Sequence, residues 1–60
     1  MVDKIKTLAK EQGLTVSEVE RKAGISHGAI GKWDKSKPLA ENLQKVASVL
    51  GVKFEDLLRG

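Results

Sequence analysis

The chain has 60 residues, of which 11 are Lys or Arg and 8 are Asp or Glu, so its net charge is +3. A domain of this size buries only about 60% of the surface of its unfolded chain and has little room for an enclosed substrate pocket. The absence of Cys excludes disulfides, a thiol nucleophile and thiolate metal sites. No apolar run approaches the roughly 18 residues of a membrane span and no signal-peptide pattern is present, so we expect no membrane partner.

The first two predicted helices show apolar residues at helical spacing. The stripe of the first helix falls at i, i+3, i+4 and i+7 and consists of Ile5, Leu8, Ala9 and Gln12. Gly13 follows, where a left-handed residue commonly ends a helix. The second helix starts with a capping box, in which the Thr15 hydroxyl caps the helix and Glu18 reaches back to a free backbone N–H. Its inner face and its end are predicted at Val19, Ala23 and Gly24.

A third helix is predicted to begin at Ser26, whose hydroxyl would be its N-cap, after a turn anchored by Ile25. Its inward-facing residues are predicted to be Ala29, Ile30 and Trp33. The two short helices and the glycine turn between them span about residues 16–35, with the second helix at about 27–35. This arrangement is a helix-turn-helix, which indicates binding to double-stranded DNA.

Two further helices complete an all-α prediction. Pro38 is placed at or just before the first turn of the fourth helix. The apolar stripe of that helix is Leu43, Val46, Ala47 and Leu50, and Gly51 ends it. A short fifth helix is expected at about 54–58, with core residues Val52, Phe54 and Leu57. No segment shows the period-two alternation of a β-strand, so we expect a single five-helix domain over residues 1–60.

The excess positive charge is confined to one part of the sequence. Residues 22–37 contain Lys22, Lys32, Lys35 and Lys37 against Asp34 alone, whereas acidic and basic residues cancel in the rest of the chain. This charge falls on the second helix of the motif and the loop after it, where a DNA backbone would be met. A solvated lysine face is the simpler explanation of the charge taken alone.

These motifs together resemble the DNA-binding domain of the lambda-repressor/Cro type, also called the Xre family. The resemblance covers residues 5–58 and rests on the capped helix start at Thr15, Gly24 at the turn, Ile25-Ser26, Ile30, Trp33 with an acidic residue after it, Pro38, and the pattern from Leu43 to Leu58. Glu20 and the segment 26–33 look most like repressors from phages and mobile elements of Gram-positive bacteria. The resemblance implies a five-helix domain in the bacterial cytoplasm that binds operator DNA, usually as a dimer, and represses or switches transcription.

If the third helix lies in the major groove, its outward positions are His27, Gly28, Gly31, Lys32 and Lys35. Lys32 suits the acceptors of guanine, although a phosphate contact is as good an interpretation. His27 could donate to a base or a phosphate, or simply be solvated. A glycine inside a helix costs about 0.5–1 kcal/mol relative to Ala, so Gly28 and Gly31 indicate a close approach of DNA or a tolerated local weakness.

Sequence-independent contacts to phosphates are expected from hydroxyl and lysine side chains on both sides of this helix. Ser17 lies near a helix start, a position that suits an anion. The other candidates are Ser26, Lys35, Ser36 and Lys37. Ser26 is expected to serve as the helix cap as well.

Three positions depart from the pattern of the family. Glu20 stands where the family usually has a small residue at the crossing of the two motif helices, so we expect it to swing outward, toward a lysine. Asp34 matches an acidic residue that often pairs with an arginine on the first helix, but that position is Ala9 here, so Asp34 needs another partner. The loop 35–37 is about one residue shorter than usual and has Ser36 where glycine is common.

One small domain with His27 and Lys32 as base readers supplies little discrimination, so two half-sites and a dimer are expected. A weak homodimer could form through the fifth helix and the residues Val49, Phe54 and Leu58, unless these complete the core. The other arrangement is the N-terminal part of a longer repressor that dimerises through a C-terminal domain.

No enzyme is expected, because the sequence has one His, no Cys and no spacing that brings a nucleophile to a base. The adjacent Glu55 and Asp56 are explained as the negative start of the last helix. No second ligand accompanies His27, so we expect no metal site, and also no other cofactor and no small-molecule substrate. The alternative to DNA binding is a protein-interaction module on the same fold, an antitoxin or an anti-repressor partner, with the glycine-rich outer face as its docking surface.

Overall fold

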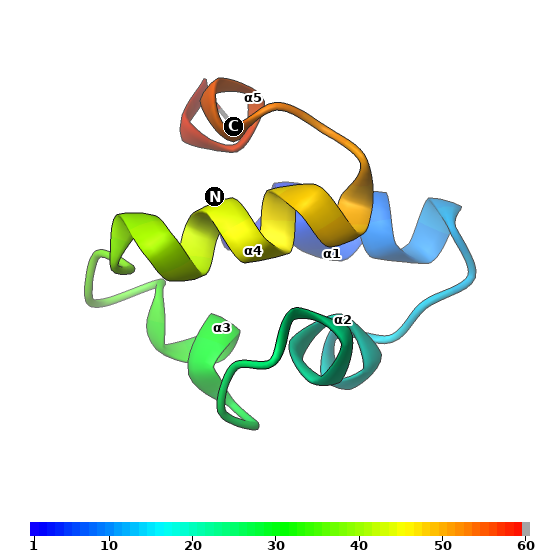
Figure 1. Cartoon of the computed structure of the whole chain (residues 1–60), viewed down its shortest axis with the longest axis horizontal. Helices are drawn as coiled ribbons and strands as arrows, with labels where there is room; N and C mark the ends of the chain where they lie inside the picture. The colour runs from blue at the N-terminus through cyan, green and yellow to red at the C-terminus, as the bar shows by residue number, and fades with distance from the viewer. Residues whose placement is uncertain (60) are drawn as a thin grey trace.

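The computed structural model describes residues 1–59, which form five α-helices and no strand (Figure 1). The helices are α1 (Val2–Glu11), α2 (Val16–Ala23), α3 (Ala29–Lys32), α4 (Ala40–Leu50) and α5 (Phe54–Arg59). In Figure 1, α4 crosses the middle of the molecule, α2 and α3 lie on one side of it, and α5 lies on the other. The predicted all-α class and the number and order of helices are confirmed for this part of the chain.

The core is built around α4, which packs against both α2 and α5. The predicted stripe of α4 is buried along its whole length. Leu57 is fully buried and anchors α5 to it. The buried apolar residues are Val2, Ile5, Ala9, Val19, Ile30, Leu43, Val46, Ala47, Leu50 and Leu57. Because they come from all five helices, each helix depends on the others for the burial of its apolar face.

The end of α1 differs from its prediction at one position. Gln12 is the C-cap of α1 and not part of its apolar stripe. Its side-chain amide donates to the backbone carbonyl oxygen of Leu50 at 2.6 Å, so it links the ends of α1 and α4. Gly13 adopts φ 73° and ends the helix as predicted. Pro38 lies just before α4, whose N-cap is Leu39.

Two large apolar side chains remain exposed in residues 1–59. Leu58 on α5 is 56% exposed and Leu39 before α4 is 71% exposed. Val49 and Phe54, the other candidates for a dimer contact, are half-buried and pack against the core. Within the same part of the chain no helix has the length and apolar character that a membrane span requires.

Candidate nucleic-acid interface

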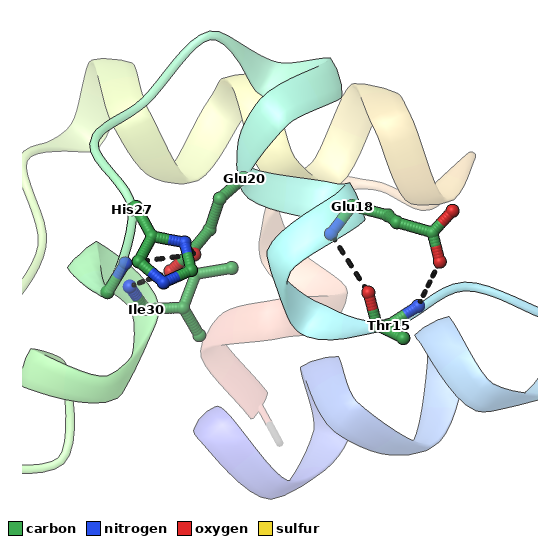
Figure 2. Close-up of polar contacts among 6 residues, drawn as sticks. Thr15, Glu18, Glu20, His27 and Ile30 are labelled. Atoms are coloured by element: carbon green, nitrogen blue, oxygen red, sulfur yellow. Dashed lines mark hydrogen bonds and ion pairs between the residues drawn. The ribbon is translucent and has the colours of Figure 1, made fainter.

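The N-terminus of α2 is held by residues next to it in the sequence. The Thr15 hydroxyl accepts a hydrogen bond from the Glu18 N–H at 3.1 Å, and the Glu18 carboxylate accepts one from the Thr15 N–H at 2.9 Å (Figure 2). The predicted capping box is therefore confirmed. The hydrogen bond from the Thr15 N–H holds the pKa of Glu18 below its usual range, and Arg21 contributes less to this shift.

The turn between α2 and α3 begins where the sequence predicts it. Gly24 is the C-cap of α2 with φ 73°. The Ile25 N–H donates to the Glu20 carbonyl oxygen at 3.0 Å, and the half-buried Ile25 side chain packs against the core. The chain then turns through Ser26 and His27, both exposed, before α3 starts.

The start of α3 corrects the prediction for Ser26. The N-cap is Gly28, with φ 87°, which has no side chain that could cap the helix. The Ser26 carbonyl oxygen accepts from the Ala29 N–H at 3.0 Å, so Ser26 closes the turn before the helix. The positive φ of Gly28 also explains why glycine stands there, since other residues rarely adopt this conformation. Gly28 is thus not inside a helix, and the predicted cost of a helical glycine does not apply to it.

The cap of α3 comes from α2 instead, through Glu20. This side chain is only 2% exposed. One carboxylate oxygen accepts from the Gly28 N–H and the other from the Ile30 N–H, both at 2.9 Å. The imidazole Nδ1 of His27, which is largely exposed, lies 3.7 Å from the first oxygen (Figure 2). The prediction that Glu20 swings outward toward a lysine is wrong, because the free N–H groups at a helix start are a better partner for a carboxylate.

The regular part of α3 is shorter than the predicted 27–35, because it covers only Ala29–Lys32. Turns continue the path of the chain beyond it. The Trp33 N–H donates to the Ile30 carbonyl oxygen at 3.0 Å, and the Lys35 and Ser36 N–H groups donate to that of Lys32 at 3.1 and 3.0 Å. Ile30 is buried and Trp33 is half-buried against the core, as the sequence predicts.

All candidate contact residues lie at the surface of these elements. Ser17 is on α2, and the others lie on the turn before α3, on α3 itself and on the loop that follows it. The exposed candidates are Ser17, Ser26, His27, Gly28, Gly31, Lys32, Lys35, Ser36 and Lys37. Positions 26–37 follow one another along the chain through the turn, α3 and the loop after it, whereas Ser17 comes from the neighbouring helix α2. Their individual roles in binding stay predictions.

The positive charge of this segment is not neutralised within residues 1–59. The ion pairs there join Arg21 to Glu18 and Lys45 to Glu41, and the His27 imidazole lies 3.7 Å from the Glu20 carboxylate. None of these contacts includes Lys32, Lys35 or Lys37. Asp34 is exposed and has no ion-pair partner in this part of the chain. Three lysine ammonium groups therefore remain available to an anionic partner.

Sequence reasoning missed the role of Glu20. The available signal was the combination of a carboxylate at the helix crossing with a glycine eight residues later, which allows the chain to turn its N–H groups back toward α2. The surface of residues 1–59 shows no pocket, and it has no group of three side chains suited to a metal ion.

A capped helix, a glycine turn and a second, outward-facing short helix define a helix-turn-helix domain. The helix-turn-helix family model HTH_3 matches residues 5–57, and the chain belongs to this lambda-repressor/Xre-like family of DNA-binding regulators. Searches of curated proteins and of solved structures gave no match to the chain.

Proposed function

We propose that the protein binds double-stranded operator DNA sequence-specifically, as a phage-type transcriptional repressor or regulator in the bacterial cytoplasm. The observation that carries the proposal is the exposed, unneutralised lysine surface on α3 and the loop after it, in a member of a DNA-binding family. A cationic surface at the reading element is what affinity for the phosphate backbone requires.

We assign the proposed base contacts from the positions of the exposed residues on α3 and the turn before it. His27, Gly31 and Lys32 face the major groove, where the Lys32 ammonium donates to the N7 and O6 acceptors of guanine. Gly31 lies within α3 and a Cβ there would meet nothing within 4 Å in the free protein. The bare backbone at Gly31 therefore leaves room for a thymine methyl or the groove wall. Gly28 keeps a place at the interface, but its conformation already accounts for its residue type.

Contacts to the phosphates flank this central group. Ser17 at the start of α2 lies on one side, and Ser26 contributes from the turn. Lys35, Ser36 and Lys37 contribute from the loop before α4. These groups fix the position of the domain on the duplex and carry no sequence information.

We further propose that two copies bind two half-sites, because two base-reading side chains give too little discrimination at about 1–3 kcal/mol each. Leu58, which is 56% exposed on α5, is the central residue of the proposed contact between copies. Sedimentation at micromolar to millimolar concentration tests the dimer. A monomer over that whole range, or a selected operator without two-fold symmetry, contradicts it.

The function is tested by selecting bound sequences from a random duplex pool and measuring their affinity over a range of salt concentrations. About 3–5 neutralised phosphates per monomer give a slope of log affinity against log salt of roughly −3 to −5. An enriched motif together with this slope supports the proposal. A pool without enrichment, or binding that does not respond to salt, contradicts it.

A matched pair of triple variants locates the interface. Replacing Lys32, Lys35 and Lys37 with Ala is expected to abolish binding at moderate salt and to flatten the salt slope. Replacing Lys6, Lys45 and Lys53 with Ala removes the same charge from exposed sites outside the motif and is expected to weaken binding only slightly. Equal losses in both variants would mean that net charge alone acts. Intact binding in the first variant would favour the protein-docking alternative.

A further inference from the structure

We propose that Glu20 is a positioning residue for DNA recognition: its buried carboxylate sets the orientation of the segment 27–32 and thereby the sequence specificity of the domain. This inference rests on the proposed DNA-binding function and adds a determinant of specificity that lies beneath the DNA-facing surface. It starts from the two hydrogen bonds that join the Glu20 carboxylate to Gly28 and Ile30.

The first step is that α3 is too short to be stable without contacts to the rest of the fold. It has four residues, which is one helical turn, and isolated helices need about 12–15 residues to be even marginally stable in water. Ile30 is its only fully buried side chain. The half-buried Ile25 and Trp33 also pack against the core on either side of the segment, but apolar contacts are not directional and do not by themselves fix the rotation of the turn between them. A second, directional attachment is therefore needed to aim the outward side chains.

Glu20 supplies that second attachment. A carboxylate whose two oxygens bind two N–H groups of one turn fixes both the distance and the rotation of that turn relative to α2. Glu20 and Ile30 are both buried, so the bond between them is shielded from water. Gly28 contributes its own N–H and the positive φ that directs both N–H groups to the same carboxylate. The carboxylate thus sets the direction in which His27, Gly31 and Lys32 point.

The second step concerns charge. The two N–H groups that Glu20 occupies are not available to a phosphate, although free N–H groups at helix starts commonly bind one. In addition, the carboxylate places one negative charge beneath a surface that meets a polyanion. Glu20 therefore opposes non-specific attraction to the backbone while it orients the groups that read bases. Loss of its charge should separate these two effects.

The test compares the wild type with Glu20→Gln, which keeps the size of the side chain but offers one acceptor oxygen and an NH₂ group in place of two acceptors. We measure affinity for the selected duplex and for a random duplex of equal length. The ratio of the two affinities is expected to fall by about tenfold, because one hydrogen bond to a charged group is lost. Affinity for the random duplex is expected to stay equal or to rise, since a negative charge is removed. General destabilisation would lower both affinities together.

The matched control is Asp3→Asn. Asp3 is an exposed acidic residue in the first turn of α1, outside both the motif and the proposed contact between copies. This substitution removes the same charge from a helix start and is expected to leave the affinity ratio within about twofold of the wild type. If the ratio of specific to random affinity in Glu20→Gln also stays within about twofold of the wild-type ratio, the proposal is overturned.

A second measurement uses the wild type and does not depend on folding of the variant. Amide hydrogen exchange of Gly28 and Ile30 is followed with and without the selected duplex, with amides of α4 as reference. Protection of both amides in both states supports the inference, because the bonds then persist during recognition. Loss of protection on binding overturns it. If the wild type binds no DNA at all, the proposed function fails, whereas protection of these amides still shows whether Glu20 holds α3 in the free protein.

Discussion

The starts of α2 and α3 solve the same chemical problem in two ways. Each helix begins with backbone N–H groups that lack partners within the helix. At α2 the partners are Thr15 and Glu18, which lie within the first turn itself. At α3 the partner is Glu20, which comes from the preceding helix and lies eight and ten residues away from the groups that it binds. Figure 2 shows both sets of bonds.

The two sets of capping hydrogen bonds differ in their burial and in whether their partners come from the same helix. The bonds of the capping box are exposed to water, and the bond from Ile30 to Glu20 is buried. A buried carboxylate with two donors is costly to disturb, because the groups left behind cannot turn to water. The start of α2 therefore finds its hydrogen-bond partners in its own stretch of sequence, whereas the start of α3 has its partner only when α2 is in place. Five measurements test these assignments, and each has an outcome that would contradict the assignment it tests.

The largest effect is expected for Glu20→Ala. Removing the carboxylate leaves the Ile30 N–H buried without a partner, and stability should fall by about 2–3 kcal/mol. Chemical denaturation of the variant and the wild type measures the difference. Glu11→Ala, at an exposed position on α1, is the control and should change stability by less than about 0.5 kcal/mol. Equal effects of the two substitutions would show that Glu20 is not a structural cap.

Alanine at the two glycines of the reading segment should act in opposite directions. A Cβ meets nothing within 4 Å at either position, so the backbone alone decides. Gly28→Ala places a side chain at φ 87° and should destabilise by about 1–2 kcal/mol. Gly31→Ala lies in the helix and should stabilise by about 0.5–1 kcal/mol. Thermal unfolding distinguishes them, and the same sign for both would refute the assigned start of α3.

The close-approach proposal adds a second readout to Gly31→Ala. If the backbone at Gly31 contacts the duplex, the added methyl group should weaken operator binding while it raises thermal stability. Undiminished affinity would remove Gly31 from the interface.

A smaller loss is expected at the local cap. Thr15→Ala removes the hydroxyl that accepts from the Glu18 N–H and should cost about 1 kcal/mol. Thr7→Ala, at an exposed position inside α1, serves as the control and should be neutral or slightly stabilising. Denaturation midpoints compare the two variants. A loss at Thr15 larger than that for Glu20→Ala would reverse the contrast between local and distant caps.

The smallest effect is a dependence on pH. The pKa of Glu18 is lowered in the folded protein, chiefly by the hydrogen bond from the Thr15 N–H. The ionised carboxylate therefore stabilises the fold above the pKa of the unfolded chain, and this contribution is lost as the pH falls through the folded-state value. The stability difference between the wild type and Glu18→Gln should shrink from neutral pH into the acid range. A difference that does not change with pH would contradict this assignment.

Features that depend on neighbouring residues were predictable from the sequence. The capping box at Thr15, the left-handed Gly24 and the stripe of α4 each follow from spacings of a few residues, and each is confirmed. The Ser26 cap and the outward Glu20 were wrong for a common reason. Both predictions treated α3 as a helix with its own local start, whereas a contact across the fold determines where it begins. The side chain of Gln12 shows the same limit, since its partner Leu50 lies 38 residues away.

In α3 the residues that attach the helix to the fold differ from the residues proposed to contact DNA, and this has a consequence for the evolution of target specificity. The attachments of this segment, Glu20 and Ile30, face inward, while Gly31, Lys32 and Lys35 make no side-chain hydrogen bond or ion pair within residues 1–59. The outward residues can therefore be exchanged without loosening the fold. A lineage of such domains can acquire new target sites through a few surface substitutions, and a laboratory library randomised at these positions should retain a high fraction of folded members.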